Sequence, residues 1–166
     1  PSGNQPFYSP KRDIVLVCNG EIYNFKELRS ELEREGYVFT SNSDSEVILY
    51  LYELYNGDIQ RLLDRLEGMF AFALWDKSKN QLILARDRFG IKPLYYFKDE
   101  KSFVFSSEIT AIKKVISPSL VSIDKTSVYE YLRYLSIPEP NTIYSEIKAL
   151  EAGNFLILSD NDYMIT

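Results

Sequence analysis

The first third of the chain alternates apolar runs with polar segments in a pattern that predicts a strand followed by helices. Residues 13–18 hold a continuous apolar run with two valines, which is typical of a buried strand. Asn19 and Gly20 follow it, and this dipeptide predicts a tight turn. Apolar residues then recur at helical spacing, so residues 24–35 are expected to form a helix with a capping box that starts at Asn24.

Two further helices are expected after a short strand over residues 37–40. The sequence SDSE at 43–46 predicts a second capping box, with Ser43 as the N-cap of a helix that runs to an Asn-Gly pair. In this arrangement Asp44 occupies the first helical position, where a carboxylate also complements the helix dipole. Residues 58–66 predict another amphipathic helix.

The rest of the chain is richer in strands. Predicted strands cover residues 69–75, 82–85, 94–97, 103–106, a short segment near 143, and 155–158, and predicted helices cover 107–116 and 124–135. Adjacent hairpins imply antiparallel pairing, so the pattern favours an α+β fold or a layered αββα arrangement over a doubly wound sheet. Periodicity alone leaves these two alternatives open.

Composition narrows the class of protein. The chain has 166 residues, which suits a single domain, and a net charge of −5 without a long basic block, which argues against a nucleic-acid partner. No apolar run approaches the roughly 20 residues that span a bilayer, so no membrane partner is expected. A single cysteine permits no internal disulfide and suits a reducing compartment, so we expect a cytoplasmic location.

The chemistry available to this chain is limited by its residue types. It contains no histidine and one cysteine, which excludes Ser–His and Cys–His nucleophiles, histidine metal sites and multi-cysteine zinc sites. Cys18 and Ser2 remain as alternative nucleophiles. Cys18 ends the predicted buried strand and has no neighbouring base, so we expect it to act as a small buried apolar residue.

Five ordered motifs resemble the class II, N-terminal-nucleophile type of glutamine amidotransferase domain, with the glutamine-hydrolysing asparagine synthetase branch as the closest match. The motifs are NGEIYN at 19–24, SDSEV at 43–47, GMFAFA at 68–73, RDRFGIKPLYY at 86–96 and SE at 107–108. The resemblance implies an N-terminal-nucleophile hydrolase fold, a four-layer αββα sandwich of antiparallel sheets. It also implies hydrolysis of glutamine to glutamate and ammonia through a cysteine thioester.

The resemblance assigns roles to four residues. Asn19, through its side-chain amide, and Gly20, through its backbone N–H, are expected to form the oxyanion hole and to contact the substrate. Glu21 and Asp44 are expected to bind the α-amino group of glutamine, a sensible match of carboxylates to an ammonium. The charged segment 86–92 is expected to play a structural role close to this site. No metal site is expected.

The chain departs from the family pattern at its front. The family's nucleophilic cysteine and a substrate-binding arginine belong to a segment upstream of the part that matches residues 3–6. We therefore interpret residues 1–166 as a single amidotransferase domain fragment that lacks the nucleophile segment, its N-terminal strand or strands, and the C-terminal synthetase domain. By itself it is expected to be inactive.

The resemblance also implies partners. These are glutamine and a synthetase domain of the same polypeptide, which would use ATP and Mg²⁺; the amidotransferase domain itself needs no cofactor. We also consider a homodimer. Two other interpretations stay open, namely a non-catalytic glutamine-binding or scaffold module and an unrelated α+β interaction domain.

Overall fold

The computed structural model describes residues 3–159 and 162–166. In chain order its elements are β1 (Phe7–Tyr8), β2 (Ile14–Ile22), α1 (Phe25–Arg34), α2 (Glu46–Leu54), α3 (Ile59–Arg65), β3 (Gly68–Asp76), β4 (Gln81–Arg86), β5 (Tyr95–Lys98), β6 (Phe103–Ser106), α4 (Ile109–Val115), the 3₁₀ helix η1 (Pro118–Leu120), α5 (Lys125–Tyr134), β7 (Ile147–Ala149), β8 (Phe155–Ser159) and β9 (Asp162–Ile165).

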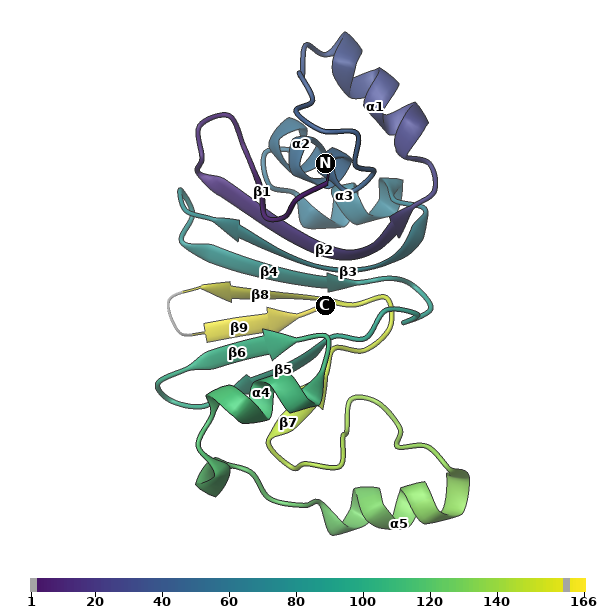
Figure 1. The fold of residues 1–166 in the computed structure, drawn as a ribbon, viewed down its shortest axis with the longest axis vertical. Helices are drawn as coiled ribbons and strands as arrows, with labels where there is room; N and C mark the ends of the chain where they lie inside the picture. Colours follow the sequence, from purple (N-terminus) through teal and green to yellow (C-terminus); the bar gives the residue numbers. More distant parts are fainter. Residues whose placement is uncertain (1–2, 160–161) are drawn as a thin grey trace.

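These strands form two antiparallel sheets. The larger sheet has six strands in the order β1-β2-β3-β4-β8-β9, and the smaller has three in the order β6-β5-β7. β2 and β3 pair along their whole length, from Ile14 opposite Asp76 to Ile22 opposite Gly68. Figure 1 shows α1, α2 and α3 at one end of the molecule and α4 and α5 at the other, with the strands between them.

Three apolar clusters show how the layers stack. The largest joins α1, α2 and α3 to one face of the six-stranded sheet and includes Leu28 and Phe72. The second lies between the two sheets and includes Ala73 and Tyr96. The third packs α4, through Ile112, on the outer side of the smaller sheet. This order of layers confirms the predicted αββα sandwich of antiparallel sheets.

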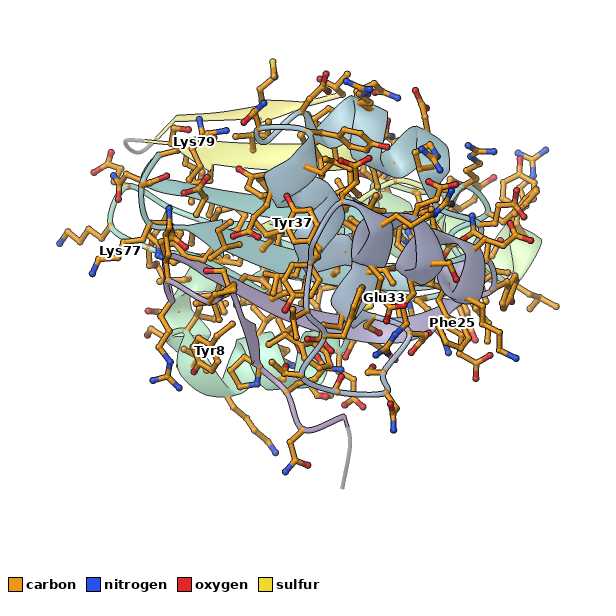
Figure 2. All side chains as sticks on the ribbon, turned by 90° about the horizontal axis from the view of Figure 1, so that it is seen from above. Tyr8, Phe25, Glu33, Tyr37, Lys77 and Lys79 are labelled. Carbon is orange, nitrogen blue, oxygen red and sulfur yellow. The ribbon has the colours of Figure 1, made fainter. Side chains whose placement is uncertain are left out.

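The helical layer over β2 follows the predicted amphipathic pattern. Figure 2 looks down on this layer, with Phe25 and Glu33 labelled on α1. Leu32 is fully buried and Phe25 packs partly against the core, whereas Glu33 is exposed and accepts a hydrogen bond from Arg29 Nε at 2.9 Å. The apolar stripe of α1 therefore faces the sheet.

The turn predicted at Asn19 and Gly20 is wrong, because both residues lie inside β2. Each pairs with β3, and Gly20 lies opposite Phe70. A long neighbouring strand outweighs the local turn preference of the dipeptide, since pairing satisfies the backbone groups that a turn would satisfy locally. As a consequence Cys18 lies in the middle of a strand and not at its end.

Other differences also come from tertiary contacts. Residues 37–40 form no strand; Tyr37 and Phe39 instead place their rings 5.2 Å and 4.9 Å from the ring of Tyr50 in α2. The strand expected near Ile143 begins later, as β7. β1 and β9 were not predicted, and the two residues of β1 are too few for a periodic pattern to emerge.

The helix caps agree with the prediction only in part. Asp124, the first residue of the helix predicted over 124–135, is the N-cap of α5, and Asp58 caps α3; each carboxylate accepts a backbone N–H of the first turn. Asn24 does not cap α1 with its side chain. Its Nδ2 donates to the C=O of Arg65 at 2.9 Å and its Oδ1 accepts from the N–H of Glu67 at 3.2 Å. Asn24 therefore ties the end of β2 to the link between α3 and β3.

Helix α5 carries apolar residues on its exposed surface. Leu132 is 74% exposed and Leu135, directly after the helix, is 80% exposed. The inward-facing Ser127 is polar and fully buried. Figure 1 shows α5 extending away from the two sheets. This helix therefore contributes little to the core of the domain.

Candidate active site

The outer edge of β2, on the side away from β3, organises the candidate site. Backbone groups along an antiparallel strand point alternately to its two sides. Phe70, opposite Gly20, directs its N–H to Asp87 Oδ2 (3.3 Å) and its C=O to the N–H of Asp87 (2.8 Å), both on the β4 side. The peptide groups of Gly20 therefore point to the outer edge, as do those of Cys18 and Ile22.

Side chains, and not a strand, occupy the edge positions on both sides of Gly20. The N–H of Cys18 donates to Gln5 Oε1 at 2.6 Å, and its C=O accepts from Gln5 Nε2 at 2.7 Å. The N–H of Ile22 donates to Asp44 Oδ2 at 2.7 Å. β1 pairs with β2 further back along the strand, so within the described residues no strand reaches Gly20. Its N–H stays open to a ligand at this edge.

The backbone of β3 leaves no room for a side chain at Gly20. Its φ is +153°, and a Cβ there would lie 2.1 Å from the carbonyl oxygen of Met69 and 2.6 Å from the Cα of Phe70. Gly68 in β3 has the matching constraint, because a Cβ on it would lie 2.2 Å from the carbonyl oxygen of Glu21. The two strands can approach this closely only because both residues are glycine.

The Asn19 side chain lies on the face of β2 that looks toward the smaller sheet. Asn19 pairs with Ala71, which belongs to the apolar cluster between the sheets. A cavity of about 190 Å³ opens here between β2, β3 and the end of β6. Its wall is mainly apolar, and its polar residues are Gln5, Asn19, Ser106 and Ser107. Asn19 therefore places one amide in a small cavity beside the open N–H of Gly20.

Asp44 is held in place by the loop around it. Glu46 is 1% exposed, and its carboxylate accepts the backbone N–H and hydroxyl groups of Thr40 and Ser41 at 2.6 to 2.9 Å. Burial alone would raise the pKa of Glu46, but the hydrogen bonds from Ser41 and Thr40 outweigh it and the pKa lies below its ordinary value. Glu46 thus fixes the loop that carries Asp44.

This geometry replaces the capping box predicted for residues 43–46. Ser45, not Ser43, directly precedes α2, and its side chain makes no capping hydrogen bond. Asp44 therefore lies outside the helix, where its carboxylate is free to reach the backbone of β2. The motif thus connects α2 to the candidate site.

Glu21 is exposed. Because side chains alternate along a strand, it lies on the same face of β2 as Asn19. Within the described residues its carboxylate accepts no hydrogen bond and forms no salt bridge. The four residues assigned from the resemblance are therefore brought together, since Asn19, Gly20 and Glu21 are consecutive and the Asp44 carboxylate binds the next N–H along. Their roles in binding or catalysis remain predictions.

Asp87 organises the loop that follows β4. Its carboxylate is 1% exposed and accepts four backbone N–H groups. Oδ1 accepts from Phe89 at 3.0 Å and Ile91 at 3.1 Å, and Oδ2 accepts from Lys92 at 3.0 Å and from Phe70 at 3.3 Å. One buried carboxylate therefore holds the loop against β3.

Arg86 holds the same loop from its other side. Its Nε donates a hydrogen bond to the C=O of Lys92 at 2.7 Å. One terminal nitrogen donates to the C=O of Gly90, also at 2.7 Å. The other terminal nitrogen donates to the C=O of Leu150 at 2.5 Å and to the Glu139 carboxylate at 2.7 Å. The loop ends at the wall of the Asn19 cavity, so this charged segment has the structural role near the site that the sequence predicted.

Cys18 faces the helices, on the opposite side of β2 from Asn19. Burial raises the pKa of its thiol to about 11; a hydrogen bond with Ser45 opposes this rise and the charge of Asp44 adds to it. A nucleophilic cysteine needs a lowered pKa. Cys18 is therefore a structural residue, and Ser2, the other alternative, lies outside the described residues.

We expect the Cys18 thiol to react slowly with iodoacetamide at neutral pH. Because the thiolate is the reactive form, a pKa raised by burial to about 11 lowers its rate roughly a hundredfold relative to an ordinary thiol. The alkylation rate should rise as the pH approaches 11. It should also rise in denaturant, because unfolding removes the burial of the thiol. Mass spectrometry of the alkylated chain measures this, and equal rates in the folded and denatured chains would contradict it.

The sequence did not predict Gln5 and Ser106 as neighbours of the site. Gln5 binds the β2 edge, and Ser106 lines the cavity. Neither has a local pattern that signals this, because each meets β2 only in the folded chain. Within the described residues no group of three or more acidic, cysteine or histidine residues could hold a metal ion.

Comparison with known proteins places this geometry in a family. The family model for the glutamine amidotransferase domain matches residues 1–166. The chain belongs to the glutamine amidotransferase family. An asparagine synthetase [glutamine-hydrolyzing] 1 of Bacillus subtilis is 39% identical over 162 residues, covering 97% of this chain and 25% of that protein. A putative asparagine synthetase of Methanocaldococcus jannaschii is 40% identical over 165 residues, covering 98% of this chain and 27% of that protein.

The amidotransferase domain thus spans about a quarter of the length of these relatives. Among solved structures it resembles a glutamine phosphoribosylpyrophosphate amidotransferase from B. subtilis, with a TM-score of 0.67 and 24% identity over 98% of this chain and 31% of that one. A glutamine aminotransferase class-II domain protein from Silicibacter pomeroyi gives a TM-score of 0.55 at 16% identity, over 98% of this chain and 70% of that one. These likenesses confirm the fold of the domain.

Proposed function

We propose that this domain is the ammonia-supplying half of an ATP-dependent, asparagine synthetase-like amidotransferase that hydrolyses glutamine to glutamate and ammonia. The observation that carries the proposal is the outer edge of β2. The open N–H of Gly20 there directly follows Asn19, and Asn19 lines a small cavity. The names of the relatives at 39% and 40% identity support the same activity.

In the proposed reaction, a cysteine thiolate from outside residues 1–166 attacks the side-chain amide carbon of glutamine. The C–S bond forms, the C=O π electrons move to oxygen, and the Asn19 amide and Gly20 N–H donate to this oxyanion. The intermediate expels ammonia after a proton reaches the leaving nitrogen, which leaves a thioester. Water then attacks the thioester carbon, glutamate forms, and the thiol recovers its proton.

The remaining site residues would hold the substrate. Glu21 and Asp44 present carboxylates beside the proposed oxyanion hole, where the α-ammonium of glutamine can pair with them. Asp44 keeps a fixed position because Glu46 orders its loop. This places binding energy at the end of the substrate that does not react.

We further propose that a synthetase domain of the same polypeptide receives the ammonia and uses ATP and Mg²⁺. The relatives are about four times as long as this chain, which leaves room for such a domain.

The exposed apolar surface of α5 offers one area for contact with that domain. A homodimer is a further proposal. Across the part of the chain that the structure describes, every helix is too short or too polar to cross a bilayer. Separately, we propose a cytoplasmic location for the protein.

A second candidate is a non-catalytic glutamine-binding or scaffold module. Cys18 favours it, because this cysteine is partly buried on the face of β2 opposite Asn19. The two candidates differ in what precedes this domain in the mature polypeptide. Sequencing of the mature N-terminus distinguishes them, because an N-terminal cysteine supports the hydrolase and any other residue supports the binding module.

Replacing Asn19 with alanine in the full-length polypeptide tests the function directly. We expect kcat for ammonia release from glutamine to fall roughly a hundredfold, as is typical when one oxyanion-hole donor is lost. Asn42→Ala is the matched control, because Asn42 is exposed and makes no side-chain hydrogen bond among the described residues. Turnover by Asn19→Ala equal to the unchanged polypeptide would overturn the oxyanion assignment, and no ammonia from the unchanged polypeptide would favour the binding module.

A further inference from the structure

The Gln5 side chain takes the place of a peptide group at the edge of β2. β1 pairs with β2 as Phe7 opposite Leu16 and Tyr8 opposite Val15. If the β1–β2 pairing continued in this register, Gln5 would lie opposite Cys18, and their backbone groups would hydrogen-bond to each other. The hydrogen bonds to Cys18 come instead from the Gln5 side chain, at 2.6 and 2.7 Å. A primary amide can do this because it offers an acceptor and a donor side by side, as a peptide does.

Because the Gln5 side chain takes the place of a peptide group, the main chain lies further from the strand edge. If the backbone pairing of β1 continued, Gly3 would lie opposite Gly20 and its peptide would bond to the open edge. Gly3 instead lies in a turn outside β1, and no backbone hydrogen bond joins it to Gly20 within the described residues. The reach of the Gln5 side chain thus separates the lead-in from Gly20 while Cys18 stays hydrogen-bonded.

Gln5 also belongs to the wall of the cavity that holds Asn19. Its hydrogen bonds to Cys18 are exposed to solvent, so they add little to the stability of the fold. They do fix the peptide that directly precedes Asn19. On the other side of Gly20, Asp44 fixes the N–H of Ile22. The Gly20 N–H therefore lies between two edge positions that side chains hold in place.

We propose that Gln5 is a positioning residue for glutamine hydrolysis: its side-chain amide replaces a backbone pair at Cys18, which keeps the Gly20 N–H open and the Asn19 amide oriented toward the developing oxyanion. This proposal rests on the proposed function.

The test measures glutamine hydrolysis by the full-length polypeptide carrying Gln5→Ala. Loss of preorganised donors affects the transition state more than the ground state, so we expect kcat to fall roughly tenfold or more while KM changes little. The melting temperature should stay close to that of the unchanged polypeptide. Gln60→Ala is the matched control, because Gln60 also uses its side-chain amide, toward Asp64 on the exposed face of α3.

Gln5→Glu gives a readout that a merely structural role would not produce. An ionised glutamate accepts from the N–H of Cys18 but repels its C=O, whereas a protonated one restores both hydrogen bonds. The ratio of its kcat to that of the unchanged polypeptide, taken at the same pH, should therefore rise as the pH falls toward the glutamate pKa of about 4.3. A ratio that does not change with pH would count against the proposal.

The outcomes separate this proposal from the proposed function. If the unchanged polypeptide releases ammonia and Gln5→Ala has the same kcat, the positioning role is overturned and the function stands. If kcat falls but KM rises in parallel, or Gln5→Ala melts well below the control, Gln5 acts in substrate binding or folding and the proposal is overturned. If the unchanged polypeptide releases no ammonia, both fail together.

Discussion

Gly20→Ala is expected to destabilise the domain by roughly 4 kcal/mol, because overpacking and backbone strain act at the same atom. The new Cβ would lie 2.1 Å from the carbonyl oxygen of Met69, a backbone atom that cannot turn aside as a flexible side chain could. The φ of +153° is also one that alanine rarely adopts. β2 and β3 would have to separate at Gly20, where β2 is the outermost strand among the described residues.

Gly36→Ala is the matched control for this variant. Gly36 also has a positive φ, +94°, but no atom lies within 4 Å of a Cβ built there. It should therefore lose only the roughly 1 kcal/mol that a left-handed backbone conformation costs. Urea denaturation of both variants measures the difference, and equal losses would show that strand contact at Gly20 does not matter.

Asp87→Asn is expected to cost roughly 4 kcal/mol, since hydrogen bonds to a buried charge each contribute about 1.5 to 3 kcal/mol. The aspartate accepts four backbone N–H groups with two oxygens. An asparagine would place its NH₂ group against two of these donors, which cannot bond to it. The loop after β4 should then loosen, and the cavity wall at Pro93 with it.

Thermal unfolding together with limited proteolysis of this loop measures both effects. Asp64→Asn is the control, because Asp64 lies on exposed α3 and accepts one hydrogen bond, from Gln60 at 3.1 Å. It should melt within a few degrees of the unchanged domain, as surface changes of about 0.5 kcal/mol do. If Asp87→Asn melts with the control and its loop stays resistant to protease, the role given to Asp87 is wrong.

These predictions share a physical origin in the six-stranded sheet. Glycine at positions 20 and 68 lets β2 and β3 approach closely, and Asp87 holds the next loop against β3. That approach fixes which way the peptide groups of Gly20 point. The stability of the β2–β3 pair and the open N–H at the edge of β2 therefore depend on the same contacts.

Much of the fold could be predicted from local pattern. The helices near 24–35 and 58–66 and the hairpin of β3 and β4 follow from apolar spacing and turn residues, and the structure confirms them. The motif order placed the chain among the glutamine amidotransferases, which the family match confirms. Such features could be predicted because neighbouring residues determine them.

The predictions of local structure that were wrong concern residues that contact distant segments of the chain. Asn19 and Gly20 form a strand because β3 pairs with them, some fifty positions along the chain (Gly20 opposite Phe70). Asn24 binds the backbone of Arg65 and Glu67 in place of the nearby groups that a capping box requires. In each case a tertiary partner outweighed the local preference.

The sequence by itself determined the fold class, the family and the residue types at the candidate site, including the absence of histidine and the single cysteine. Only the tertiary structure decided how these residues are used. It put Asn19 and Gly20 inside a strand, turned Cys18 toward the helices, and placed Gln5 and Asp44 on either side of the open N–H. The physical reason is that hydrogen bonds at a strand edge join groups 13 and 22 residues apart, which local propensity does not specify.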